Sequence, residues 1–239
     1  MRKVAVFIAV AALGTTIGAA AAGAGESGDV KKFCKTSVTI DAAPEGPTPR
    51  LLERFRTTAP TEIAETVDSA VTTFEESGEG AFEDEAFVAS LREIDQFLLD
   101  NCDYEQVDVT MQEYAFDGIP DEIEKGTVAF NLTNEGSELH EFVVVRLKGD
   151  ATLDDLLELP EDATEEDFAE FASEVPGGGF AIPGQSDLAL VNFKRTGNYV
   201  AACFVPVGST DEAAAEAADE AGAPPHFIEG MAAEFEVTG

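Results

Sequence analysis

Four side chains in the second half of the chain have the chemistry of metal ligands. Cys203 ends a segment that begins at Gly197, and His226 and Met231 follow it after an acidic, alanine-rich stretch. His140, further upstream, is the other of the chain's two histidines. Thiolate, imidazole and thioether are donors that copper prefers, and this set completes a trigonal site with a weak axial sulfur. We therefore predict that His140, Cys203, His226 and Met231 bind one copper ion.

The patterns around these residues resemble the ligand segments of cupredoxins of the plastocyanin type. The three segments are Asn-x-Gly-x-x-x-His ending at His140, Gly-x-Tyr-x-x-x-Cys ending at Cys203, and His-x-x-x-Gly-Met from His226 to Met231. A Pro-Gly turn at residues 182–186 also resembles the family's approach to the strand before the cysteine. The resemblance covers roughly residues 107–239. It implies an eight-stranded Greek-key sandwich with one type 1 copper that serves electron transfer.

Two features depart from the family pattern. Residues 204–225 separate Cys203 from His226, where plastocyanin-like proteins have only a few residues. Glu141 follows His140, where the family usually has asparagine. An ionised Glu141 would favour Cu(II) and lower the reduction potential. We expect the edge of His226 to be exposed and to pass the electron.

Each of the four residues also has a purely structural interpretation. A buried apolar cysteine, a core methionine and a capped or surface histidine are all common in sandwich folds. The metal interpretation is favoured because both histidines and Cys203 occur together at spacings similar to those of the family.

The first residues predict export. Residues 1–24 have a basic start, a short apolar run and Ala-x-Ala cleavage sites, as in a secretory signal peptide. We expect a periplasmic, cell-surface or extracellular protein without membrane insertion after cleavage. Three cysteines in an oxidising compartment predict one disulfide and one remaining thiol. Pairing Cys34 with Cys102 leaves Cys203 free, protected either by copper or by burial.

The hydropathy pattern predicts an α+β chain in which a β-sandwich follows a small helical module. The resemblance to cupredoxins implies a Greek-key topology for the sandwich, and the predicted Cys34–Cys102 disulfide would staple the module. The module spans residues 25–104: a polar leader to residue 32, then three short helices before Cys102. The sandwich spans residues 105–239. Its strands are expected at residues 107–114, 126–133, 142–145, 188–193, 199–204 and 234–237.

Three connecting segments of the sandwich have their own patterns. Leucine and phenylalanine spacing predicts two short helices inserted at residues 151–172. Residues 176–179, Pro-Gly-Gly-Gly, are expected to form a flexible return. The acidic stretch 208–225 is expected either to form one or two exposed helical turns or to stay mobile.

The charge balance limits the partners. The 239 residues include 48 acidic and 14 basic ones, for a net charge of −34. Such a surface repels nucleic acid and anionic lipid, so we exclude both as partners. An acidic surface favours either the binding of a basic redox partner or solubility in a saline medium. We expect a monomer.

Three functions remain open at this point. The first is an exported electron carrier with one copper ion. The second is a copper-handling protein that binds and delivers the ion, and the third is a metal-free cupredoxin-like interaction module. Catalysis is not expected, because oxidase chemistry needs further copper centres and the chain has no further histidines.

Overall fold

The computed structural model of the chain describes residues 29–239 except 44–45, 160–167 and 169. The chain divides into two compact units, with a boundary between Asp103 and Tyr104. The predicted signal peptide, residues 1–24, lies outside the described residues. In the part that is described, no helix is both long and apolar enough to span a membrane.

The first unit is helical. Its described elements are α1 (Val30–Asp41), α2 (Pro49–Thr58), α3 (Ala64–Ser77), the 3-10 helix η1 (Gly78–Glu83) and α4 (Glu85–Asn101). The prediction of three helices therefore missed α1, which begins inside the expected polar leader. Asp29 caps α1 by accepting the backbone N–H groups of Lys31 and Lys32 at 3.1 and 3.4 Å. Because of this cap, α1 begins before Phe33, which is its first buried side chain.

A disulfide and stacked aromatic rings hold the helical unit together. Cys34 of α1 and Cys102, just after α4, are bonded with their Cα atoms 5.9 Å apart. This bond confirms the predicted disulfide-stapled module. Phe33 is fully buried and stacks on Phe55 of α2 at a ring distance of 4.8 Å. Helix α3 adds the buried side chains of Val67, Ala70 and Val71, so all four α-helices contribute to the core of this unit.

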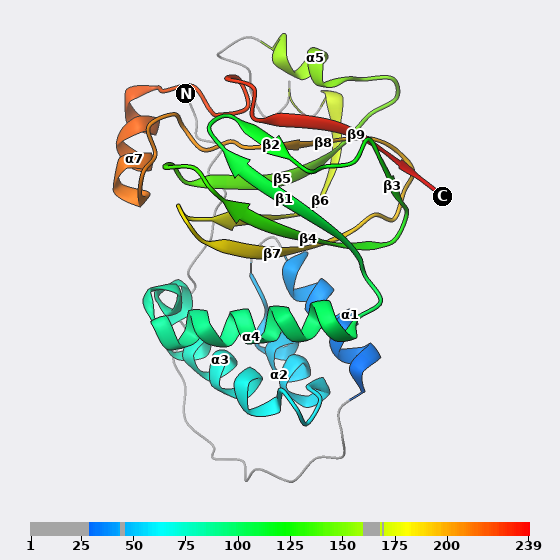
Figure 1. Ribbon diagram of the computed structural model, residues 1–239, viewed down its shortest axis with the longest axis vertical. Coiled ribbons are helices and arrows are strands. Elements are labelled where there is room, and N and C mark those ends of the chain that lie inside the picture. Colours follow the sequence, from blue (N-terminus) through cyan, green and yellow to red (C-terminus); the bar gives the residue numbers. More distant parts are fainter. Residues whose placement is uncertain (1–28, 44–45, 160–167, 169) are drawn as a thin grey trace. The chain divides into compact units, whose positions relative to one another are not determined.

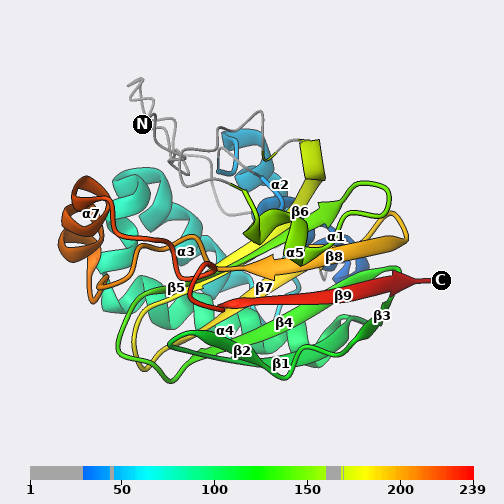
Figure 2. The same cartoon turned by 90° about the horizontal axis from the view of Figure 1, so that it is seen from above.

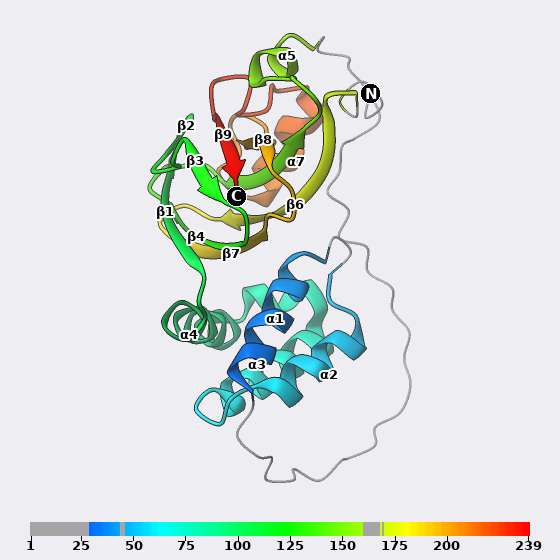
Figure 3. The same cartoon turned by 90° about the vertical axis from the view of Figure 1, so that its right-hand side faces the viewer.

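The second unit is a sandwich of two sheets (Figures 1 and 3). One sheet has the order β2-β1-β4-β7, and the other has the order β3-β9-β8-β5-β6. The strands are β1 (Glu105–Gln112), β2 (Ala115–Asp117), β3 (Glu122–Glu124), β4 (Thr127–Asn134), β5 (His140–Leu147), β6 (Ala172–Ala181), β7 (Ser186–Asn192), β8 (Gly197–Ala202) and β9 (Ala232–Thr238). Side chains that alternate along these strands fill the space between the sheets, and Val128, Phe130 and Phe142 are fully buried there.

The six predicted strands all occur, but β2, β3 and β6 were not predicted, so nine strands are described where the resemblance implied eight. The expected flexible return at residues 176–179 is wrong, because these residues lie within β6. A Cβ at Gly179 would lie 2.6 Å from Leu132 Cδ1 and 2.8 Å from Asp187 Oδ2. A side chain at Gly179 would therefore force the Leu132 and Asp187 side chains to move, because β6 lies close to β4 and β7 there. The Asp187 carboxylate accepts the N–H of Phe180 at 2.9 Å and ties β6 to β7.

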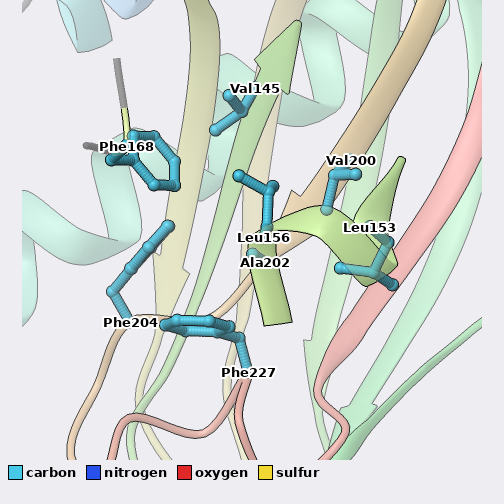
Figure 4. A pocket seen from close by; sticks show the side chains of 8 residues that line it. All are labelled: Val145, Leu153, Leu156, Phe168, Val200, Ala202, Phe204 and Phe227. Atoms are coloured by element: carbon cyan, nitrogen blue, oxygen red, sulfur yellow. The ribbon is translucent and has the colours of Figure 1, made fainter. Parts of the chain in front are cut away.

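An insertion covers the outer face of the five-stranded sheet. Its first predicted helix is α5 (Leu153–Leu157), which begins at a Thr152–Asp155 capping box. The second falls largely on residues outside the described ranges. A small apolar pocket lies under α5 (Figure 4), lined by Val145, Leu153, Leu156, Phe168, Val200, Ala202, Phe204 and Phe227.

The acidic stretch after β8 forms a helix at one end of the sandwich (Figure 2). Helix α7 (Glu212–Ala221) starts at Asp211, whose side chain accepts the N–H of Ala214, and ends at Gly222 with φ of 74°. None of its side chains is buried, although Ala215 packs partly against the core. The segment is therefore ordered as a surface helix.

Candidate metal centre

Three of the predicted ligands converge at one end of the sandwich. His140 begins β5, Cys203 directly follows β8, and His226 lies between α7 and β9. Nδ1 of His140 is 3.2 Å from Nδ1 of His226, which is 3.4 Å from Cys203 Sγ. One donor atom from each residue lies within 4.8 Å of the other two, and all three residues are fully buried. Nitrogen and thiolate donors bind first-row metals at about 2.0–2.3 Å, so donors this close together can share one ion.

Backbone hydrogen bonds explain how the long Cys203–His226 separation leaves the site intact. The N–H of Phe227 donates to Cys203 O, and that of His226 donates to Val205 O, both at 2.9 Å. The N–H of Val207 donates to Pro224 O, also at 2.9 Å. We call these bonds between residues 203–207 and 224–227 the base ladder. The ladder brings the two ends of the segment between Cys203 and His226 together. We call this segment the long insertion; α7 lies beyond the ladder, away from the two ligands.

The backbone of Met231 lies beside Cys203 and His226, at the same end of the sandwich. Its N–H donates to His226 O at 3.0 Å, and its carbonyl accepts the N–H of Cys203 at 3.1 Å. The side chain is fully buried. Met231 is thus bonded through its backbone to two of the predicted ligands, and its assignment as the axial ligand remains a prediction.

The surroundings of Cys203 favour the neutral thiol until a cation arrives. Burial raises its pKa to about 12, against hydrogen bonds from the backbone of Glu141 and Val205. The N–H of Glu141 points to Sγ at 3.3 Å. A bound metal ion would supply the positive charge that favours loss of the Cys203 proton, because the thiolate is the metal-binding form of cysteine. Burial also raises the pKa of Glu141, which weakens the electrostatic effect expected from a negative charge at that position.

Both imidazoles are in the state that a metal needs. Burial, with repulsion from His226, lowers the pKa of His140 to about 4. Burial likewise lowers the pKa of His226, although Glu138 opposes the shift. The rings are therefore neutral at pH 7, and each has one nitrogen lone pair for coordination.

Two carboxylates that the sequence analysis did not select lie behind the imidazoles. Glu138 Oε2 is 3.1 Å from His226 Nε2, and Glu113 Oε1 is 3.6 Å from His140 Nε2. Burial of Glu113 disfavours its charge, but backbone N–H groups, first that of Glu138, outweigh this and hold the pKa below its usual range. Gly136 leaves room for it, since a Cβ there would touch the Glu113 carboxylate.

Asn134 is the asparagine of the Asn-x-Gly-x-x-x-His segment, for which no role was predicted. It is fully buried at the end of β4. Its Nδ2 donates to Glu138 O and Ala181 O, and its Oδ1 accepts the N–H of Gly136, all at 2.8 Å. Asn134 thus fixes the loop that leads to His140 and joins it to the end of β6.

The expected exposed edge of His226 is wrong, since the residue is fully buried. Its ring lies beside that of Tyr114 at 4.9 Å, and its Nε2 faces Glu138. Tyr114 is only partly buried. Tyr114, just after β1, and Glu138, just before β5, thus lie against an imidazole that was expected to reach the surface.

The strand order and the buried Cys–His–His cluster define the class of the second unit as a cupredoxin-like sandwich, which confirms the predicted fold class and resemblance. No protein-family model and no curated protein sequence matches the chain.

The solved structures to which the chain is similar include the following three. The reduced auracyanin of Roseiflexus castenholzii is 19% identical, with 56% of this chain and 97% of that chain covered and a TM-score of 0.34. Auracyanin A of Chloroflexus aurantiacus, described as a "blue" copper protein, is 15% identical over 56% and 98% of the two chains, with a TM-score of 0.33. Rusticyanin of Thiobacillus ferrooxidans is 14% identical, with 56% of this chain and 78% of that chain covered and a TM-score of 0.32.

Proposed function

We propose that this protein is an electron carrier with one copper ion held by His140, Cys203 and His226, with Met231 as the axial ligand. The observation that carries the proposal is the buried convergence of Cys203 Sγ and the two Nδ1 atoms. A His₂Cys set with a weak axial sulfur is the donor set of electron-transfer copper sites. When bound, copper supplies a one-electron couple between Cu(II) and Cu(I).

The chain supports such a couple by keeping its ligands still. The strands β5 and β8 pair directly and position His140 and Cys203, and the base ladder fixes His226. Full burial of the three donors excludes water from their faces. Rigid donors reduce the structural change between the two oxidation states, and the N–H of Glu141 shields the sulfur charge.

Electron exchange needs a route other than the edge of His226. The ring of Tyr114 packs on that of His226 and is partly exposed. We propose that a redox partner docks over Tyr114. The strongly acidic composition favours a basic partner protein at that surface.

Export belongs to the same proposal. The support is the basic, apolar and small-residue pattern of residues 1–24 together with the Cys34–Cys102 disulfide, a bond typical of oxidising compartments. We propose a periplasmic, cell-surface or extracellular location. The buried ligands disfavour copper delivery, because a protein that passes on the ion has to open its site to a partner.

Addition of Cu(II) to the purified protein tests the function. We expect an intense visible thiolate-to-copper absorption that bleaches with a reductant and returns on oxidation. The Cys203→Ser variant serves as the control and should lack the band. Tight Cu(I) binding without a reversible couple would support the copper-handling alternative. The absence of colour and of any change in melting temperature would support the metal-free module.

A further inference from the structure

Glu138 joins three parts of the chain around the candidate metal centre. Its Oε2 accepts the N–H groups of Gly208 and Ser209 at 2.5 and 3.0 Å and faces His226 Nε2 at 3.1 Å. Its Oε1 accepts the hydroxyl of Tyr114 at 3.4 Å. The side chain is only 14% exposed. A carboxylate has about four lone-pair sites, and four donors face this one.

The backbone around Glu138 is fixed as firmly as its side chain. Its N–H donates to Glu113 Oε1 at 2.6 Å, and its carbonyl accepts Asn134 Nδ2 at 2.8 Å. The next residue, Leu139, donates its N–H to Ser209 O at 2.7 Å. The carboxylate is thus held from one side by the loop before His140 and from the other side by the start of the long insertion.

This arrangement selects one protonation form of His226. A carboxylate can only accept hydrogen bonds, so the neighbouring Nε2 carries the imidazole proton. Nδ1 of the neutral ring then keeps its lone pair, at 3.2 Å from Nδ1 of His140 and 3.4 Å from Cys203 Sγ. A carboxylate behind a ligating imidazole fixes its tautomer and raises its basicity.

We propose that Glu138 is the positioning residue that allows a long insertion between two ligands of one site. It binds the first turn of the insertion through Gly208 and Ser209, and it holds His226 with Nδ1 free for the metal. The inference deepens the proposed function and rests on it for the identity of the ion. In the copper form, the carboxylate favours Cu(II) over Cu(I) because it adds negative charge behind the ligand.

The metal-free protein provides the first test, through the Glu138→Ala variant. Nitrogen NMR of the imidazoles should show His226 protonated at Nε2 in the native chain and a mixture of tautomers in the variant. Amide exchange at Gly208 and Ser209 should become about tenfold faster or more, since hydrogen bonds to a charged group are lost. Glu135→Ala is the matched control, because Glu135 is exposed and lies in the same loop.

The copper form provides the second test and includes the Glu138→Gln variant, which keeps an oxygen acceptor and removes the charge. We expect Cu(II) affinity to fall about 10- to 100-fold in Glu138→Ala. In Glu138→Gln the preference for Cu(II) over Cu(I) should fall about tenfold, which corresponds to a rise of about 59 mV in the one-electron potential.

The outcomes separate the two proposals. A native chain that does not bind Cu(II) overturns the proposed function. A His226 tautomer and amide exchange rates that are the same in Glu138→Ala and Glu135→Ala overturn the role of Glu138, whatever the copper test shows. If Glu138→Ala does not fold, a potential in Glu138→Gln equal to that of Glu135→Gln overturns it.

Discussion

Asn134 shows how a single amide can hold a ligand loop. Its two N–H groups and its carbonyl are all used, on Glu138 O, Ala181 O and Gly136 N–H. Ala181 pairs with His140 across β5 and β6. The amide therefore joins the loop before the first ligand to the strand beside it. Aspartate or leucine could not replace it, because neither provides two donors and one acceptor.

Replacement of Asn134 by alanine should destabilise the sandwich by about 3 kcal/mol, because the buried carbonyl of Ala181 and two partly buried backbone groups lose their partner. Asn131→Ala is the control. It removes one bond to Asp108, so it should cost about 1 kcal/mol or less. Urea unfolding of both variants gives the comparison. Equal stabilities would show that the Asn134 network contributes nothing beyond an ordinary surface contact.

At the residue scale, the sequence indicated the predicted metal ligands but not the carboxylates that lie behind them. Cys203 and the two histidines could be selected because these residue types are rare in the chain and soft donors suit few roles. Glu113 and Glu138 belong to a set of 48 acidic residues, so their type carried no signal. Only the strands and loops that bring them behind the imidazoles show their role.

At the scale of elements, the base ladder and α7 have separate tasks. The ladder brings residues 224–227 back to Cys203 and its neighbours. Helix α7 lies beyond the ladder and buries no side chain. The length of the insertion is therefore unrelated to the geometry of the ligands.

Replacement of residues 210–222 by a short glycine-serine turn should preserve the copper absorption and the reduction potential. The free energy of unfolding should change by about 1 kcal/mol or less, because each halving of loop length changes closure entropy by about 0.6 kcal/mol. The contrasting variant is Val207→Pro, which removes the N–H that bonds Pro224 O. It should weaken Cu(II) binding. Loss of the absorption band in the shortened chain would contradict the separate roles.

The elements that the sequence did not predict have clear physical reasons. Strands β2 and β3 span only three residues each, too short for an alternating pattern to appear. Strand β6 contains Pro176 and three glycines, which normally indicate a turn. It lies at the edge of its sheet, where proline is tolerated, and its glycines permit the close approach of neighbouring strands. Only tertiary contacts could reveal this.

At the scale of the whole molecule, the chain combines two units with different sources of stability. The sandwich has a large apolar core between its sheets. The helical unit has a thinner core and a disulfide between residues that lie 68 positions apart. In the chain-entropy description, a bridge closing a loop of that length stabilises the folded state by about 4 kcal/mol.

Substitution of both Cys34 and Cys102 by alanine should therefore lower the stability of the helical unit by about 4 kcal/mol. The proposed copper site should persist, because all four proposed ligands belong to the sandwich. Thermal unfolding followed by far-ultraviolet circular dichroism and by visible absorption separates the two effects. Loss of the copper absorption at a temperature where the native chain keeps it would show that the site depends on the helical unit.

X-ray absorption at the copper edge of the loaded protein tests whether His140, Cys203 and His226 bind one copper ion together. We predict a shell with one sulfur and two imidazole nitrogens at about 2.0–2.3 Å, and loss of the short sulfur contribution in Cys203→Ser. A spectrum from oxygen and nitrogen donors alone, unchanged by that substitution, would contradict it.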